Sequence, residues 1–224
     1  IPKASAINAP CVFLVYHPDE NGALRIDAQP VSRGGLMGIY FPGPMGGIDA
    51  QRMASDITGQ IKRRGFSGVL LDVPVGTAVF TERKWVRLTR ARITCLDYST
   101  DMLAQAEKRL GGYAHIQCVQ GDVGNLPMAD EAFDTVVSMN GFHAFPDKQK
   151  AFQETWRVLK PGGDFIACFY IKGKSKRTDW LVQTVLAKKG WFTPPFQTEE
   201  ELRAILQSLY KETDIHIDGS MAYF

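Results

Sequence analysis

A short apolar strand that ends in an aspartate, together with the glycine turn after it, contains the residues best suited to bind a ligand. The run Val69–Phe80 begins as a buried apolar strand, carries Asp72 near its end and then turns through Pro74 and Gly76. A strand that turns through glycine into a helix leaves backbone N–H groups at the helix start, where a carboxylate or phosphate can bind. Asp72 would repel a pyrophosphate. It therefore favours a ligand that also carries a positively charged ammonium group.

A second carboxylate follows the next predicted strand. Arg92–Leu96 is short and apolar, and Asp97 stands 21 residues after Gly76. Nucleotide-binding α/β folds place a carboxylate about 20 residues beyond the glycine turn, where it accepts the ribose hydroxyls. An N-cap or surface aspartate is the alternative interpretation, but the order of strand, acid and helix favours ribose binding.

The glycine pattern does not match a dinucleotide site. Such a site needs Gly-x-Gly-x-x-Gly so that the pyrophosphate can approach the backbone. Only Gly76 is present, because Pro74 and Ala78 stand near it where further glycines would be expected. A nicotinamide-dependent oxidoreductase is therefore a weaker alternative.

A histidine lies in the loop after another predicted strand. Phe133–Met139 is apolar, and Asn140–Asp147 behind it contains His143. Ligands of open α/β sheets bind at the carboxyl ends of the strands. An imidazole with a pKa near neutrality can act as a general base. His143 could equally shape a pocket by packing or hydrogen bonding, and the sequence leaves both roles open.

Strands and helices alternate through the centre of the chain, which predicts a doubly wound, mainly parallel α/β sheet. An antiparallel strand pair follows at the C-terminal end, and Trp191–Phe196 is an aromatic loop. With Trp180, that loop forms either an apolar wall of the pocket or part of the core. The predicted strands are Val69–Asp72, Arg92–Leu96, His115–Gln120, Phe133–Met139, Asp164–Tyr170, Thr213–Asp218 and Ser220–Phe224; the predicted helices are Thr77–Arg90, Ser99–Leu110, Lys148–Leu159 (with Phe152, Trp156 and Leu159 inward), Thr178–Lys189 and Thr198–Tyr210.

The first part of the chain differs from this pattern. Cys11–Tyr16 and Ala23–Asp27 flank a turn-rich link and predict a hairpin. Val31–Ile48 is rich in glycine and predicts either a loop that closes over a site or a structural wrap, whereas Asp49–Arg64 has the apolar spacing of an amphipathic helix. We therefore expect residues 1–48 to form an N-terminal arm and residues 49–224 to form the ligand-binding domain.

Composition limits the class of protein. The chain has 224 residues with 45% hydrophobic and 22% charged side chains, as expected of a soluble α/β domain. A net charge of +2 argues for neither nucleic acid nor a membrane surface. The basic run Lys172–Arg177 is either a solvated loop or a contact for an acidic substrate or lipid headgroup. Four cysteines without Cys-x-x-Cys spacing predict reduced thiols, no metal site and a cytoplasmic location.

Taken together, the motifs resemble the class I S-adenosylmethionine-dependent methyltransferases of the ubiquinone/menaquinone-biosynthesis type (methyltransferase domain 11-like). The pattern Asp72-x-x-x-Gly76-x-Ala78 resembles motif I, although the usual Asp/Glu-x-Gly-x-Gly-x-Gly is changed at Pro74 and Ala78. Gln120–Pro127 resembles the third binding motif, Phe133–Met139 resembles motif IV, and Leu159–Gly163 also matches. The resemblance covers about residues 50–224.

The resemblance implies a Rossmann-like, seven-stranded methyltransferase fold with an antiparallel C-terminal strand pair. It also implies in-line transfer of a methyl group to a small, partly apolar or aromatic metabolite, with S-adenosylhomocysteine as product. It implies neither a nucleic-acid partner nor integral membrane association; a homodimer is compatible with it. A non-catalytic scaffold of the same fold is the alternative. The implied catalytic residues are His143 and Asn140. The implied cofactor-binding residues are Asp72 and Gly76 (methionine end), Asp97 (ribose), Asp122 (adenine), Tyr98 and Val123 (adenine ring), and, without a more specific role, Pro74, Thr77, Met102, Gly121 and Asn140.

Overall fold

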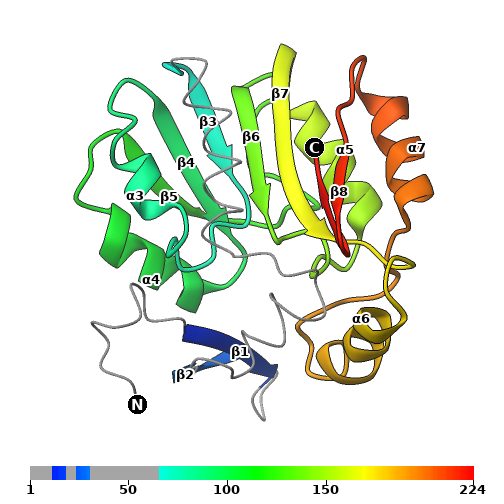
Figure 1. The fold of residues 1–224 in the computed structure, drawn as a ribbon. Coiled ribbons are helices and arrows are strands. Elements are labelled where there is room, and N and C mark those ends of the chain that lie inside the picture. The colour runs from blue at the N-terminus through cyan, green and yellow to red at the C-terminus, as the bar shows by residue number, and fades with distance from the viewer. Residues whose placement is uncertain (1–11, 19–23, 31–65) are drawn as a thin grey trace.

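A seven-stranded sheet forms the centre of the protein. The structure is a computed structural model that describes residues 12–18, 24–30 and 66–224, with side chains described from residue 66 onward. The strand order is β5-β4-β3-β6-β7-β9-β8, and β9 runs antiparallel to both of its neighbours (Figure 1). This arrangement confirms the predicted mainly parallel α/β sheet with its reversed C-terminal pair.

The predicted strands form with small changes at their ends. The main exception is β7, which begins five residues before the predicted start because Leu159 already pairs with Phe133 ahead of a register shift. The strands are β3 (Val69–Asp72), β4 (Arg92–Asp97), β5 (Ile116–Gln120), β6 (Phe133–Met139), β7 (Leu159–Tyr170), β8 (His216–Asp218) and β9 (Met221–Tyr223).

Side-chain caps begin most of the helices, as the sequence predicts. Ser99 accepts a hydrogen bond from the Met102 N–H, and Thr198 forms a capping box with Glu201. The helices are α3 (Glu82–Trp85), α4 (Thr100–Leu110), α5 (Lys148–Arg157), α6 (Lys176–Leu181) with the π-helical turn η2 (Val182–Leu186), and α7 (Glu199–Leu209).

The predicted helix Thr77–Arg90 is wrong for most of its length. Only Glu82–Trp85 is helical, and the preceding residues form successive turns. Gly76 and Ala78 both have a φ of +58°, in the left-handed region, and this backbone conformation is incompatible with a right-handed helix. The turns instead bury Trp85 completely against one face of the sheet.

Two tryptophans lie on the surface, although the sequence analysis placed Trp156 inward and Trp180 in either the pocket wall or the core. Trp156 is 51% exposed because α5 turns Ala151, Phe152 and Thr155 toward the sheet. Trp180 is 63% exposed because α6 buries Thr178 instead. The loop aromatics Phe192 and Phe196 are buried and pack on Tyr170, so the loop belongs to the core.

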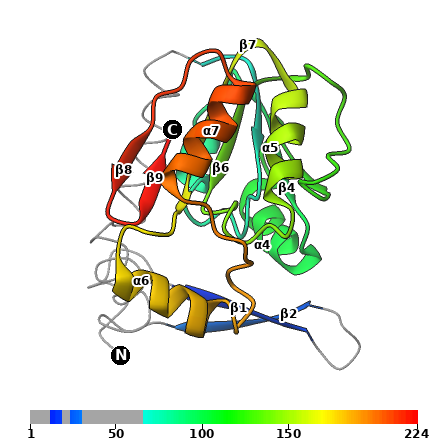
Figure 2. The ribbon, with the colours of Figure 1, turned by 90° about the vertical axis from the view of Figure 1, so that its right-hand side faces the viewer.

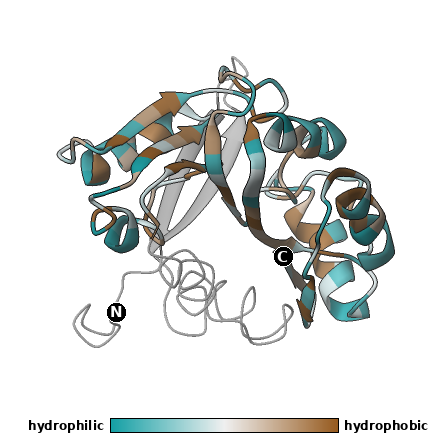
Figure 3. Ribbon diagram, turned by 90° about the horizontal axis from the view of Figure 1, so that it is seen from above, coloured by the Kyte–Doolittle hydropathy of each residue, from teal (hydrophilic) through white to brown (hydrophobic). Residues whose placement is uncertain are grey.

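Apolar side chains cover both faces of the sheet. On one face, Leu70 and Ile93 pack with residues of α3, α4 and η2. On the other, Leu71 and Val136 pack with residues of α5 and α7. Figure 2 shows α5 and α7 on their side of the sheet, and Figure 3 shows largely hydrophobic strands between helices that carry hydrophilic residues outward. Alternating side chains of each strand thus anchor both helical layers.

The N-terminal hairpin is confirmed. β1 (Val12–Pro18) pairs antiparallel with β2 (Leu24–Pro30), and the two form a sheet of their own. The predicted loop 31–48 and the predicted helix 49–64 lie outside the described residues, so the domain boundary near residue 48 stays a prediction. Within the described ranges, no helix is both long and apolar enough to cross a bilayer.

We predict that Ala78→Gly stabilises the protein by about 1 kcal/mol, because glycine adopts a positive φ without the steric cost that alanine carries. Chemical denaturation should show this gain. The matched control is Ala106→Gly in the middle of α4, which should lose about 1 kcal/mol. A loss at both positions would contradict the left-handed conformation of Ala78.

Candidate active site

The predicted site residues follow strands whose carboxyl ends meet at one edge of the sheet. β3 pairs with β4 on one side and with β6 on the other, so the strand order reverses at β3 (Figure 1). Ligands of open α/β sheets bind outside the carboxyl ends of the strands at such a reversal. This edge is therefore the candidate site.

The Asp97 carboxylate connects the first two loops of the site. The Gly76 N–H donates to Asp97 Oδ2 at 2.8 Å, and the Ser99 N–H donates to Oδ1 at 2.9 Å. Asp97 is 5% exposed, and burial raises its pKa although these backbone hydrogen bonds oppose the rise. Each carboxylate oxygen has more than one acceptor position, so the group can also accept hydroxyl groups of a ligand.

Asp72 lies deeper than the sequence suggests. Its side chain is 1% exposed, and Oδ2 accepts a hydrogen bond from Trp85 Nε1 at 2.6 Å. Burial raises the pKa of this carboxyl to about 7, more than the hydrogen bond from Trp85 lowers it. Asp72 thus fixes Trp85 and the turns between β3 and α3.

A close backbone approach brings the loop after β3 against the loop after β6. A Cβ at Gly141 would lie 2.2 Å from Pro74 Cδ and 2.9 Å from Ser138 Oγ, so only glycine fits there. The neighbouring Asn140 has a φ of +54°, and its N–H donates to the Cys168 carbonyl at 2.8 Å. The predicted residues Pro74 and Asn140 therefore belong to one packed unit.

The loop after β5 adjoins the same edge. The Gly121 N–H donates to the Asp97 carbonyl at 3.1 Å, and a Cβ at Gly121 would lie 2.9 Å from Leu96 Cδ1. Asp122 Oδ1 accepts the Gly124 N–H at 2.8 Å, which shapes the turn. Val123 is buried in the core that includes Leu96.

The remaining predicted cofactor residues differ in exposure. Tyr98 is 65% exposed directly after β4, whereas Thr77 and Met102 are buried. An exposed aromatic ring beside Asp97 can pack on a ligand ring. The individual binding roles of these residues stay predictions.

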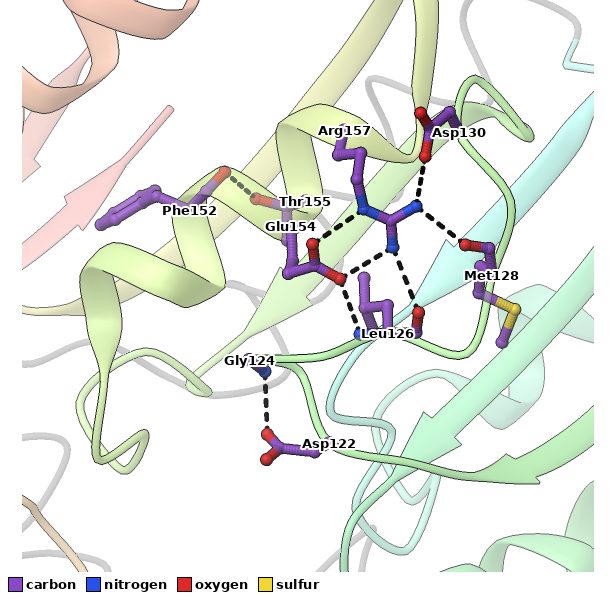
Figure 4. A network of polar contacts seen from close by, with 9 residues as sticks. All are labelled: Asp122, Gly124, Leu126, Met128, Asp130, Phe152, Glu154, Thr155 and Arg157. Carbon is purple, nitrogen blue, oxygen red and sulfur yellow. Dashed lines mark hydrogen bonds and ion pairs between the residues drawn. The ribbon is translucent and has the colours of Figure 1, made fainter.

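An ion pair on α5, which the sequence analysis missed, holds the loop after β5 (Figure 4). Glu154 Oε2 accepts the Leu126 N–H at 2.7 Å and also bonds Arg157 at 2.8 Å. Arg157 donates to the carbonyls of Leu126 (3.1 Å) and Met128 (2.9 Å) and to Asp130 (2.6 Å). The only signal in the sequence was the i, i+3 spacing of an acid and a base on a predicted helix.

His143 is a buried, stacked ring. It is 6% exposed and lies parallel to Phe192 at a centroid distance of 4.0 Å. Burial, with a smaller effect of the nearby Lys148 charge, lowers its pKa to about 3, so the ring is neutral at physiological pH. The His143 carbonyl accepts the Thr193 N–H at 2.9 Å, which joins the loop after β6 to the aromatic loop.

Lys148 makes a second connection between these loops. Its Nζ donates to the Phe145 carbonyl at 3.0 Å and to the Thr193 carbonyl at 2.6 Å. Burial lowers its pKa to about 8. The sequence analysis treated Lys148 only as the start of a helix, because its partner in the aromatic loop is 45 residues away.

Residues 66–224 offer no arrangement of three or more histidine, cysteine or acidic side chains that could hold a metal ion. In that part of the chain, Cys95, Cys118 and Cys168 are free thiols, and Cys95 and Cys168 are buried. The candidate site at the carboxyl ends of the strands contains backbone groups, carboxylates and aromatic rings.

Comparison with known families agrees with this geometry. Residues 71–167 match the family model described as "Methyltransferase domain". The match begins inside β3 and ends inside β7, so it includes all four loops at the candidate site.

Individual relatives are also methyltransferases. The demethylmenaquinone methyltransferase of Desulfitobacterium hafniense (strain Y51) is 39% identical over 98 residues, which are 42% of this chain and 39% of that protein. The malonyl-[acyl-carrier protein] O-methyltransferase of Geobacter sulfurreducens is 33% identical over 159 residues, 69% of this chain and 60% of that protein. The chain thus spans about two fifths of the length of the first of these relatives.

A solved structure shares the fold. The CMeT domain of the citrinin polyketide synthase superposes with a TM-score of 0.64 at 18% identity, covering 84% of this chain and 54% of that one. At that identity the likeness is one of fold alone.

We predict that Asp72 makes stability fall as the pH rises. Its pKa is higher in the folded than in the unfolded protein, so between about pH 4 and pH 7 the unfolded state releases the proton while the folded state keeps it. Stability therefore falls progressively across this range and changes no further above it. Relative to Asp72→Asn, the wild-type free energy of unfolding should decrease by roughly 4 kcal/mol at most over this range. Denaturant titrations at several pH values measure the difference, and parallel curves for the two proteins would exclude a raised pKa.

We also predict that Arg157→Met destabilises the protein by about 2 kcal/mol, because Glu154 and two loop carbonyls lose their charged donor. Hydrogen exchange should accelerate most in residues 124–130. Arg109→Met is the matched control: Arg109 makes a more exposed ion pair with Glu82, and its loss should cost less than about 1 kcal/mol. Equal effects of the two substitutions would contradict the conclusion that Arg157 holds the loop after β5.

Proposed function

We propose that this chain is a class I methyltransferase and that it transfers the methyl group of S-adenosylmethionine to a small, partly apolar or aromatic acceptor. The observation that carries the proposal is the hydrogen bond between Gly76 and Asp97, which unites the two main cofactor motifs at the reversal of strand order. The proposed product from the cofactor is S-adenosylhomocysteine.

The residues present fit such a cofactor. A Cβ at Gly76 would have no atom within 4 Å, so this turn leaves open space beside the backbone. We assign the ribose hydroxyls to Asp97, the adenine amino group to Asp122 and the adenine ring to Tyr98 and Val123. Asp72 supports the methionine end through Trp85, because its own carboxylate is buried against the indole.

The bound cofactor supplies an already activated methyl group, so the protein mainly has to position the acceptor for in-line displacement. We propose that His143 shapes the acceptor site and does not act as a base, because its buried ring binds a proton only near pH 3. Lys148 and the stacked Phe192 hold the acceptor loop in place. Asn140 lies at the beginning of that loop and precedes Gly141, whose backbone lies against Pro74.

The acceptor class rests on the aromatic loop and on the relatives. Phe192 and Phe196 place apolar rings behind the loop that contains His143. The relatives' names indicate methylation of demethylmenaquinone in one case and of malonyl-[acyl-carrier protein] in another. A quinone precursor is the acceptor that we favour. The described residues give no support to a homodimer, and it is not part of the proposal.

Calorimetric titration with S-adenosylmethionine and S-adenosylhomocysteine tests the proposal. We expect micromolar affinity for both, reduced at least about tenfold in Asp97→Ala because a charged acceptor of hydrogen bonds is removed. Asp101→Ala in the first turn of α4 is the matched control and should bind like the wild type.

Two outcomes would overturn the proposal. Folded protein that binds neither compound would favour a non-catalytic scaffold of the same fold. A change in the fluorescence of reduced nicotinamide dinucleotide on mixing would favour an oxidoreductase. Circular dichroism of each variant separates loss of binding from loss of folding.

A further inference from the structure

Positive charge is concentrated in the segment that contains α6. Residues 172–189 hold six basic side chains and one acidic side chain, a net charge of +5, whereas the whole chain has a net charge of only +2. The remainder of the chain is therefore slightly acidic. A local basic surface exists even though the total charge suggests none.

The structure separates the charges of this segment. Asp179, its single acid, accepts hydrogen bonds from the buried Tyr170 hydroxyl at 2.7 Å and from the Gly173 N–H at 2.9 Å, so it faces the protein. Lys176 and Arg177 are exposed. Lys174 forms an ion pair with Glu199 and therefore contributes less positive charge to the outer surface than Lys176 and Arg177 do. The exposed side of the segment thus carries the positive charges of Lys176 and Arg177, while the one acid of the segment, Asp179, faces the protein.

Trp180 shares the helix face with these cations. Lys176 and Arg177 precede it by four and three residues, the spacing of neighbours on one side of a helix. The indole is 63% exposed, although α6 offers a buried side at Thr178. Lys188 and Lys189 add exposed positive charge at the end of the segment. An exposed tryptophan among cations is the composition that partitions into the headgroup region of a bilayer.

The position of α6 suits a docking surface. Five residues separate the carboxyl end of β7 from the start of the helix, and both views show the helix beyond the end of the sheet and away from α5 and α7 (Figures 1 and 2). The aromatic loop connects the same segment to the His143 ring. A surface bound through α6 would therefore lie near the acceptor end of the site.

We propose that this face of α6, defined by Lys176, Arg177 and Trp180, docks the protein reversibly on an anionic lipid bilayer. Phospholipid headgroups complement the cations, and the indole enters the interface while the helix stays outside the hydrocarbon. A single-stranded nucleic acid fits less well, because binding it generally uses several stacking aromatics and Trp180 is the only exposed one in residues 172–189. The inference goes beyond the proposed function and does not depend on the cofactor.

Flotation with lipid vesicles tests the proposal on the full chain. Vesicles of phosphatidylcholine alone are compared with vesicles that also contain phosphatidylserine, at low and at high salt. We expect binding only to the anionic vesicles and release by salt. The double variant Lys176→Glu/Arg177→Glu and the single variant Trp180→Ala should each reduce the partition coefficient roughly tenfold.

The matched control lies on α5. Lys150→Glu/Trp156→Ala changes an exposed cation and an exposed tryptophan there, and it should bind vesicles like the wild type. The proposal fails if folded protein ignores anionic vesicles or if the control loses as much binding as the α6 variants. It also fails if binding is insensitive to Trp180→Ala and equally strong to single-stranded RNA, which would indicate a general polyanion surface. Each variant is also titrated with S-adenosylmethionine. Loss of vesicle binding with cofactor binding intact would then be distinguished from failure of the proposed function.

Discussion

The hydrogen bond from the Gly76 N–H to the Asp97 carboxylate is the constraint on which the site depends. Its donor lies in the turns after β3 and its acceptor ends β4, so it fixes the two loops that adjoin the reversal of strand order. The Ser99 N–H binds the other carboxylate oxygen and begins α4. One buried anion therefore positions a turn, a strand end and a helix start, since charged acceptors form stronger hydrogen bonds than neutral ones.

Other loops are fixed by charged side chains from α5. Arg157 and Glu154 hold the loop after β5, and Lys148 holds the loop after β6 against the aromatic loop. These contacts satisfy backbone groups that no strand or helix can pair, and that is how irregular segments become rigid. A rigid edge is what a reaction governed by positioning requires. On the outer face of α6, Lys176 and Arg177 make no such contact with the described residues, and this face is available to an external partner.

The sequence alone determined the fold class, the order of the strands along the chain and most helix limits. Buried strands and capped helices are local patterns, so periodicity and cap residues such as Ser99 and Thr198 suffice to predict them. It also predicted which segments adjoin the candidate site, because motif residues directly follow the predicted strands, and the match of residues 71–167 to a methyltransferase family model agrees with the resemblance.

Only the tertiary structure decided how these residues act. Ala78 adopts a left-handed conformation that its helix-forming propensity opposes, and packing of Trp85 on Asp72 replaces the predicted helix with turns. The sequence could not show that His143 is buried, nor that Lys148 and Arg157 reach loops distant along the chain. Burial, pKa and long-range hydrogen bonds depend on neighbours brought together by folding, whereas strand and helix formation depends mainly on residues close in sequence.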